Sequence, residues 1–230
     1  NYDNYYDGES DWRRLGAIGK MKNIISLCDK FPHNSILEIG SGEGAILQEL
    51  SDQRFGESLY SLEISKSALE AIKKRNINSL IECNLFDGYN IPYGDNKFDL
   101  AILSHVVEHL EHPRKLLYEA SRVAKQVFIE VPLEDNLRLK MDYAYDRVGH
   151  INFYSLKTIR RLIQTSGLQI LSQKNTNISS DCFKYMFGKK GALRYFLKEF
   201  LLRITPDLAT KISTYHYSML CRRKDLHTHT

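Results

Sequence analysis

The alternation of short apolar runs with helical patterns constrains the fold of this chain more than any other feature of its sequence. Five apolar runs of strand length follow one another, and segments with helical spacing of apolar residues separate most of them. These runs are residues 35–39, 58–62, 79–83, 98–103 and 126–131. Because short buried strands alternate with helices, they predict an α/β fold with a mostly parallel sheet and helices on both faces.

Residues typical of helix ends border several of the segments between the predicted strands. Ser65 is the expected N-cap of one helix, and Ser155 and Gly167 are the expected N-cap and C-terminal stop of another. The helices predicted up to this point cover residues 12–30, 45–50, 66–75, 113–123 and 156–166.

The alternation loosens after the fifth strand. Residues 168–171 and 214–221 predict a sixth and a seventh strand, and residues 176–212 predict a helical insertion between them. The length of 230 residues suits a single α/β domain. We divide it into an N-terminal helical cap, a cofactor-binding core, an acceptor-side region, the helical insertion and the last strand. Their ranges are 1–34, 35–132, 133–175, 176–212 and 213–224.

Glycines crowd the turn after the first strand. Gly40, Gly42 and Gly44 let the backbone turn tightly and approach a ligand, and the following helix offers free N–H groups. Glu63 ends the second strand, which places its carboxylate beside this loop in an open α/β sheet. A carboxylate there can accept ribose hydroxyls. Loop and acid together predict an adenosine-containing cofactor, either a nicotinamide dinucleotide or S-adenosylmethionine (SAM).

Further runs favour SAM. Glu38 precedes the first glycine by two residues, and an Ile-Pro-Tyr-Gly-Asp-Asn-Lys-Phe-Asp run spans residues 91–99. Residues 104–110 read Ser-His-Val-Val-Glu-His-Leu, and residues 149–155 read Gly-His-Ile-Asn-Phe-Tyr-Ser. In combination, residues 12–175 resemble class I SAM-dependent methyltransferases, especially the small-molecule "type 11" and ubiquinone-biosynthesis group. The resemblance implies a Rossmann-like seven-stranded fold, SAM as methyl donor and S-adenosylhomocysteine as product.

The resemblance also implies roles for the residues around the cofactor. The glycines would pack against methionine and ribose, and the acid after the second strand would hold the ribose hydroxyls. Residues after the third strand would contact adenine, the serine after the fourth would lie near the methyl group, and N-terminal residues would meet the methionine end. The expected cofactor-binding residues are Glu38, Gly40, Gly42, Gly44, Glu63, Asn84, Leu85, Ser104 and Trp12, with Tyr6 and Arg13 as further candidates.

Two histidines are the candidates for the acceptor side. Methyl transfer is an in-line displacement that needs positioning and in some enzymes a base, and an imidazole suits an OH or NH acceptor. His105 directly follows the fourth strand, and His150 lies in the region expected to cover the acceptor pocket. We therefore expect transfer to a small-molecule O or N acceptor.

Other functions remain open at this point. An NAD(P)-dependent oxidoreductase could use the same glycine loop, and a non-catalytic SAM-binding module would carry it too. The run from His105 to His109 also matches the H-x-x-E-H pattern, in which two histidines on one helix face ligate zinc. Because that pattern begins at the end of a strand, we expect no metal there.

Composition limits the partners and the compartment. A net charge of +4 is too weak to predict nucleic-acid binding. Four widely spaced cysteines and the lack of a signal-peptide pattern or a membrane-length apolar run predict reduced thiols and a cytoplasmic location. Residues 189–204 combine an apolar stripe with basic residues. The stripe predicts packing over the sheet edge or the acceptor pocket, with contact to a membrane surface or a dimer interface as alternatives. We expect a monomer or a homodimer.

Overall fold

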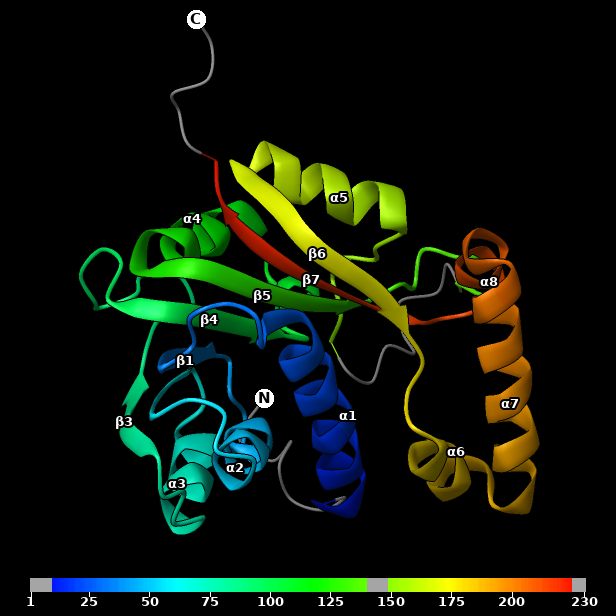
Figure 1. Ribbon diagram of the computed structural model, residues 1–230, viewed down its shortest axis with the longest axis horizontal. Coiled ribbons are helices and arrows are strands. Elements are labelled where there is room, and N and C mark those ends of the chain that lie inside the picture. The colour runs from blue at the N-terminus through cyan, green and yellow to red at the C-terminus, as the bar shows by residue number, and fades with distance from the viewer. Residues whose placement is uncertain (1–9, 140–148, 225–230) are drawn as a thin grey trace, which may run out of the picture.

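A seven-stranded sheet forms the centre of the protein (Figure 1). The computed structural model describes residues 10–139 and 149–224. The strands are β1 (Ser35–Ile39), β2 (Ser58–Glu63), β3 (Leu80–Leu85), β4 (Phe98–Ser104), β5 (Ala124–Pro132), β6 (Leu168–Thr176) and β7 (His216–Arg223). They lie in the order β3-β2-β1-β4-β5-β7-β6, and only β7 runs antiparallel to its neighbours. The predicted fold class is confirmed.

Helices cover both faces of the sheet, as Figure 1 shows. On one face lie α1 (Ser10–Cys28), α2 (Ala45–Asp52) and α3 (Lys66–Lys74), and on the other α4 (Pro113–Val123) and α5 (Leu156–Thr165). Each layer has its own apolar core. Ile24 and Leu47 pack with Leu100 on the first face, and Leu116 and Ile159 belong to the core of the second.

Local signals set the helix ends as the sequence predicts. The Ser65 hydroxyl accepts a hydrogen bond from the backbone N–H of Ala68, at 3.3 Å, and so caps α3. Ser155 and Thr158 form a reciprocal capping box at the start of α5. Gly167 follows α5 with a φ of +70°, a conformation that glycine adopts without strain.

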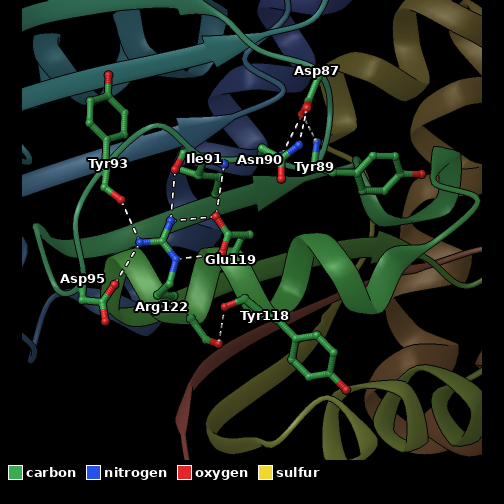
Figure 2. A network of polar contacts seen from close by, with 10 residues as sticks. Asp87, Tyr89, Asn90, Ile91, Tyr93, Asp95, Tyr118, Glu119 and Arg122 are labelled. Atoms are coloured by element: carbon green, nitrogen blue, oxygen red, sulfur yellow. Dashed lines mark hydrogen bonds and ion pairs between the residues drawn. The ribbon is translucent and has the colours of Figure 1, made fainter.

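An arginine on α4 fixes the chain that leads into β4 (Figure 2). The Arg122 guanidinium donates to the carbonyls of Ile91 and Tyr93, at 3.0 and 2.8 Å, and pairs with the carboxylates of Asp95 and Glu119. Because the planar guanidinium donates to four residues at once, it holds this connection against the helix. The connection begins at Phe86, which borders the cavity described below.

The helical insertion forms α6 (Ser180–Phe187), α7 (Lys189–Ile204) and α8 (Pro206–Ile212) beyond the end of β6 (Figure 1). Gly191 allows α6 and α7 to meet, because a Cβ there would overlap the Phe183 carbonyl oxygen. Tyr215 and Lys198 anchor α7 through hydrogen bonds to the carbonyls of Lys198 and Thr214.

The predicted packing of the α7 stripe over the sheet edge is wrong. Five of its apolar side chains are 60–66% exposed. They are Leu193, Phe196, Leu197, Phe200 and Ile204. The physical reason is orientation, since α7 turns its small Gly191 side to α6 and its apolar stripe away from it. Among the residues that the structure describes, no helix combines the length and hydropathy needed to cross a membrane.

Candidate functional site

A cavity of about 910 Å³ opens at the carboxyl ends of the central strands. Glu38 of β1, Glu63 of β2 and Ser104 of β4 line it, with α1 as one wall. In an open α/β sheet, the strand ends at the point where the order reverses form the usual ligand crevice. Here the order reverses between β1 and β4, so the sheet topology itself places the cavity.

The glycine loop forms the floor of the cavity. Gly40 has a φ of +72°, and a Cβ added to it would lie 2.7 Å from Cγ2 of Val106. Gly42 also has a positive φ, and both glycines line the cavity. Gly44 does not line it. It has a φ of +77° and precedes α2, so its visible role is the turn into that helix.

Glu63 is fixed against this loop by backbone donors. Its Oε2 accepts from the N–H of Gly42 at 2.7 Å, and its Oε1 accepts from the N–H groups of Ile64 and Ser65 at 2.8 and 3.0 Å. The side chain is buried, and an ionised carboxylate has about four acceptor positions. Three are in use, which leaves one on Oε2 for a ligand.

Glu38 is the least satisfied acid of the cavity. It is 2% exposed, and its Oε2 has no hydrogen-bond partner among the described residues. Burial raises the pKa of Glu38 to about 8, although the nearby Lys20 opposes this shift. A buried carboxyl in this condition is stabilised by a cationic or hydrogen-bond-donating ligand.

Helix α1 contributes a wall with an unfilled surface. Gly16 and Gly19 line the cavity, and a Cβ added to either would meet no atom within 4 Å. Glycine lowers helix stability by about 1 kcal/mol relative to alanine, so two on one face are costly unless the space is used. Trp12 and Arg13 line the cavity from the same helix.

The adenine-side candidates lie outside the cavity. Asn84 and Leu85 end β3 and are exposed, and the Asn84 amide donates to the Tyr93 hydroxyl at 3.2 Å. Phe86 and Gly88 line the cavity in their place. Adenine contact through Asn84 and Leu85 stays a prediction, and Tyr6 lies outside the described residues.

The acceptor-side candidate His105 belongs to a buried network. It adopts a φ of +58°, its Nδ1 lies 3.2 Å from Oε1 of Glu108, and its Nε2 lies 3.5 Å from Oε1 of Glu130. His216 of β7 approaches the same Glu130 oxygen at 3.8 Å. Burial opposes ionisation of Glu130, yet His105, His216 and Ser218 lower its pKa to about 2.

The other candidate, His150, lies at the rim of the same cavity. Its Nδ1 lies 2.6 Å from a carboxylate oxygen of Glu134, and its ring lies 4.8 Å from that of His109. His109 in turn contacts the Gly149 carbonyl through Nδ1, at 3.1 Å. The structure thus brings both predicted histidines to one cavity, each beside a carboxylate.

The zinc-peptidase interpretation of the H-x-x-E-H run does not match the local backbone. Val107–His109 form a single 3₁₀ turn, and His105 precedes it in a left-handed conformation. The two histidines therefore do not share an α-helical face, and they fall into different clusters of possible metal ligands.

Three residues of the network were missed by sequence reasoning. Glu108 belongs to a run explained by the family resemblance, and His216 lies in a predicted last strand with no visible link to the site. Glu130 carried a usable signal, since it is the only charged residue among residues 126–131 and has apolar neighbours on both sides. A fully buried carboxylate in a central strand needs a partner.

Comparison with known proteins adds family and fold. Residues 14–173 match the family model of the methyltransferase domain. The 2-phytyl-1,4-naphtoquinone methyltransferase of Trichormus variabilis is 27% identical over 175 residues, covering 61% of this chain and 75% of the relative.

Two solved structures show the same fold at low identity. One is a chain of the complex between the Haloferax volcanii Trm112 methyltransferase activator and its methyltransferase, with a TM-score of 0.64, 15% identity and coverage of 95% of this chain and 97% of that one. The other is phosphoethanolamine N-methyltransferase 2 of Haemonchus contortus, solved with phosphomonomethylethanolamine and S-adenosylhomocysteine. Its TM-score is 0.61 at 13% identity, and the match covers 90% of this chain and 53% of that one.

Proposed function

Because this chain belongs to the methyltransferase domain family, as the match over residues 14–173 shows, we propose that it transfers a methyl group from SAM to a small-molecule O or N acceptor. The observation that carries the proposal is one cavity with two chemically different ends. Glycines and acids line the end at β1 and β2, and histidines line the end at β4 and β7. Its volume of about 910 Å³ is near the upper end of the roughly 300–1,000 Å³ typical of ligand pockets, which leaves room for donor and acceptor together.

The residues at the β1–β2 end fit SAM. Glu38 offers an unpartnered buried oxygen to the positively charged methionine end, and Glu63 keeps one acceptor position for a ribose hydroxyl. Gly40 and Gly42 let the cofactor lie close to the backbone. The hydroxyl of Ser104 also has no hydrogen-bond partner among the described residues. Bound there, SAM supplies an electrophilic methyl group on a sulfonium centre.

The same acids disfavour a dinucleotide. Glu38, Glu43 and Glu63 all line the cavity around the glycine loop. Glu43 pairs with Arg13 and Arg75, at 3.2 and 2.8 Å. Because the two arginines neutralise Glu43, the repulsive charge is that of Glu63, whose carboxylate already accepts from the Gly42 N–H that a pyrophosphate at the start of α2 would need. This electrostatic argument favours SAM over NAD(P).

At the acceptor end, His105 and His150 lie beside carboxylates that orient their rings. Both imidazoles can position an acceptor, and that of His150 can take up its proton. We assign the acceptor side to His105, residues 133–175 and the start of β7, and the cofactor side to the strand ends of β1 and β2 with the glycine loop.

Ligand-dependent thermal unfolding tests the proposal. A ligand at about 100 times its dissociation constant adds roughly 2.7 kcal/mol, which for a domain of this size raises the midpoint by on the order of 5–10 °C. We expect this shift with SAM and S-adenosylhomocysteine, no shift with NAD, and loss of the shift in Glu63→Gln. The exposed acid Glu57, replaced in Glu57→Gln, is the matched control and keeps the shift. No shift with either SAM or S-adenosylhomocysteine at millimolar concentration refutes the proposal.

A further inference from the structure

Three polar side chains from three strands converge at the acceptor end of the cavity. His105 follows β4, Glu130 lies in β5, and His216 begins β7. One nitrogen or oxygen atom from each lies within 4.8 Å of the others. The strands β4, β5 and β7 are adjacent in the sheet, and backbone hydrogen bonds fix each one to the next. The spacing of the three side chains is therefore set by the rigid part of the fold.

We propose that His105, Glu130 and His216 bind a divalent transition-metal ion of the zinc type. Two imidazoles and one carboxylate are the protein ligands of many catalytic zinc sites, which keep a further position open. In a tetrahedral site with bonds near 2.0–2.1 Å, neighbouring ligand atoms lie about 3.4 Å apart. The Glu130 oxygen lies 3.5 Å from Nε2 of His105 and 3.8 Å from Nδ1 of His216, so small side-chain rotations would close the site around an ion.

Unpartnered atoms point to the same place. Nε2 of His105 and Oε1 of Glu130 are both buried, and neither has a hydrogen-bond partner among the described residues. Glu130 is completely buried. Buried polar atoms in native proteins are nearly always hydrogen-bonded or bound to an ion or water, and these two atoms, 3.5 Å apart, lie at a distance that a shared cation would suit.

Neighbouring groups orient the ligands as metal sites require. The other oxygen of Glu130 accepts hydrogen bonds from Asn23 at 2.8 Å and Ser218 at 2.5 Å, which leaves Oε1 for the ion. Nδ1 of His105 faces the buried carboxylate of Glu108, at 3.2 Å. A metal-ligating histidine commonly donates its second ring nitrogen to such a carboxylate, which presents the lone pair of the first to the metal.

The open side of the site faces the cavity. The side chains of His105 and His216 are 18% and 17% exposed, whereas Glu130 behind them is not exposed at all. An ion held here would present its remaining coordination positions to a ligand in the cavity. These residues differ from the H-x-x-E-H pair, because His109 belongs to a separate cluster with Glu108 and His150.

If the proposed function holds, a metal ion at this place also restricts which methyl acceptors are expected. An ion at the acceptor end favours a hydroxyl acceptor, because coordination lowers the pKa of a bound hydroxyl. The hydroxyl proton then passes to His150 at the same cavity, the bond between sulfur and methyl breaks, and the bond between oxygen and methyl forms. The products are a methyl ether and S-adenosylhomocysteine.

Direct metal binding is the test. The full chain, with His227→Ala and His229→Ala as background to remove two further imidazoles, is dialysed against Zn²⁺ and its metal content measured. Co²⁺ is the spectroscopic probe, since a site with nitrogen and oxygen ligands and fewer than six ligands gives visible absorption. We expect one ion per chain, and at least a 100-fold loss of affinity in His105→Ala, His216→Ala and Glu130→Gln. His109→Ala and His33→Ala are matched controls that keep the ion.

S-adenosylhomocysteine binding, measured on the same variants, separates the possible outcomes. Unchanged binding in a variant that has lost Zn²⁺ shows that the variant is folded and supports the proposal. If the wild type binds S-adenosylhomocysteine but no Zn²⁺ above background, the metal site is wrong while the proposed function stands. If Zn²⁺ is kept in His105→Ala and lost in His109→Ala, the ion belongs to the other cluster and the proposal is overturned. Zn²⁺ binding without any S-adenosylhomocysteine binding supports the site and refutes the proposed function.

Discussion

Glu38 connects stability and ligand binding through one carboxyl group. Its pKa is raised from 4.5 to about 8 in the folded protein, because burial disfavours the charged form. The folded state therefore holds the proton more tightly than the unfolded state. Stability is unaffected by this group below about pH 4.5 and falls as the pH rises from there to about 8, since the unfolded chain gains more from ionisation.

Replacing this carboxyl by an amide should remove the penalty. We expect Glu38→Gln to be more stable than the wild type at pH 8, by on the order of a few kcal/mol, and to equal it near pH 4. Urea unfolding across this pH range measures the difference, with Glu57→Gln as the control. The same variant should bind SAM more weakly, because the amide does not neutralise a cation. Equal stability differences at both pH values would contradict the assigned pKa.

Side chains that act alone are easier to predict from sequence than side chains that act in a network. Glu63 could be placed because a strand end beside a glycine loop fixes its surroundings, and its hydrogen bond to Gly42 confirms that location. His216 could not be placed, because its role depends on the pairing of β7 with β5, in which its pairing partner Pro132 lies 84 positions earlier in the chain. Its partner Glu130 was visible only as an isolated charge in an apolar strand.

At the scale of single elements, two glycines lower the stability of helix α1 and leave space in the cavity beside it. Gly16 and Gly19 lie on its cavity side with room for a side chain. We expect Gly19→Ala to stabilise the protein without ligand by about 1 kcal/mol, since alanine is the better helix former. Gly19→Leu should lower SAM affinity by at least tenfold while the fold is kept. Calorimetric titration and thermal unfolding of both variants measure the two effects.

The matched control lies on the far side of the same helix. Arg14 is exposed and does not line the cavity, and Arg14→Leu places a leucine there. It should leave SAM affinity unchanged. If Gly19→Leu also binds SAM normally, α1 does not border the cofactor.

The exposed stripe on α7 predicts contact with a membrane surface. Lys189, Lys190, Arg194 and Arg203 flank it, so the helix combines an apolar strip with positive charge. We expect the protein to co-sediment with anionic vesicles at low salt and to be released when Phe196 and Phe200 are both replaced by serine. Tyr118→Ser, which changes an exposed aromatic residue on α4, is the control and should still bind. Failure of the wild type to bind vesicles would contradict membrane contact and favour the alternative, in which the stripe forms an interface between two chains.

Element types were more predictable than their extents and orientations. The range 113–123 of α4 and the range 35–39 of β1 agree with the sequence prediction, because Pro113 and the glycine loop mark their ends. β6 runs to Thr176, five residues beyond the predicted end, since its polar second half is recruited by pairing with β7 at the sheet edge. The direction in which α7 turns its apolar stripe depends on Gly191 packing against α6, which periodicity cannot reveal.

At the scale of the whole molecule, the last strand holds the sheet together. β7 lies between β5 and β6, so its loss would leave β5 as a bare apolar edge and β6 without a partner. Unpaired edges of this kind promote aggregation. We expect a chain ending at residue 212 to be insoluble or to bind the dye ANS strongly, whereas a chain ending at residue 224 should unfold like the full protein. A soluble, cooperatively folding 1–212 fragment would contradict this role of β7.

The position of β7 also has a consequence for synthesis in the cell. The glycine loop, Glu63 and His105 all leave the ribosome before the last strand does, and His216 completes their cavity only afterwards. A nascent chain can therefore assemble the parallel half of its sheet while translation continues, yet the acceptor end can form only after β7 has left the ribosome. A nascent chain that still lacks β7 would therefore hold the glycine loop and Glu63 without a complete acceptor end.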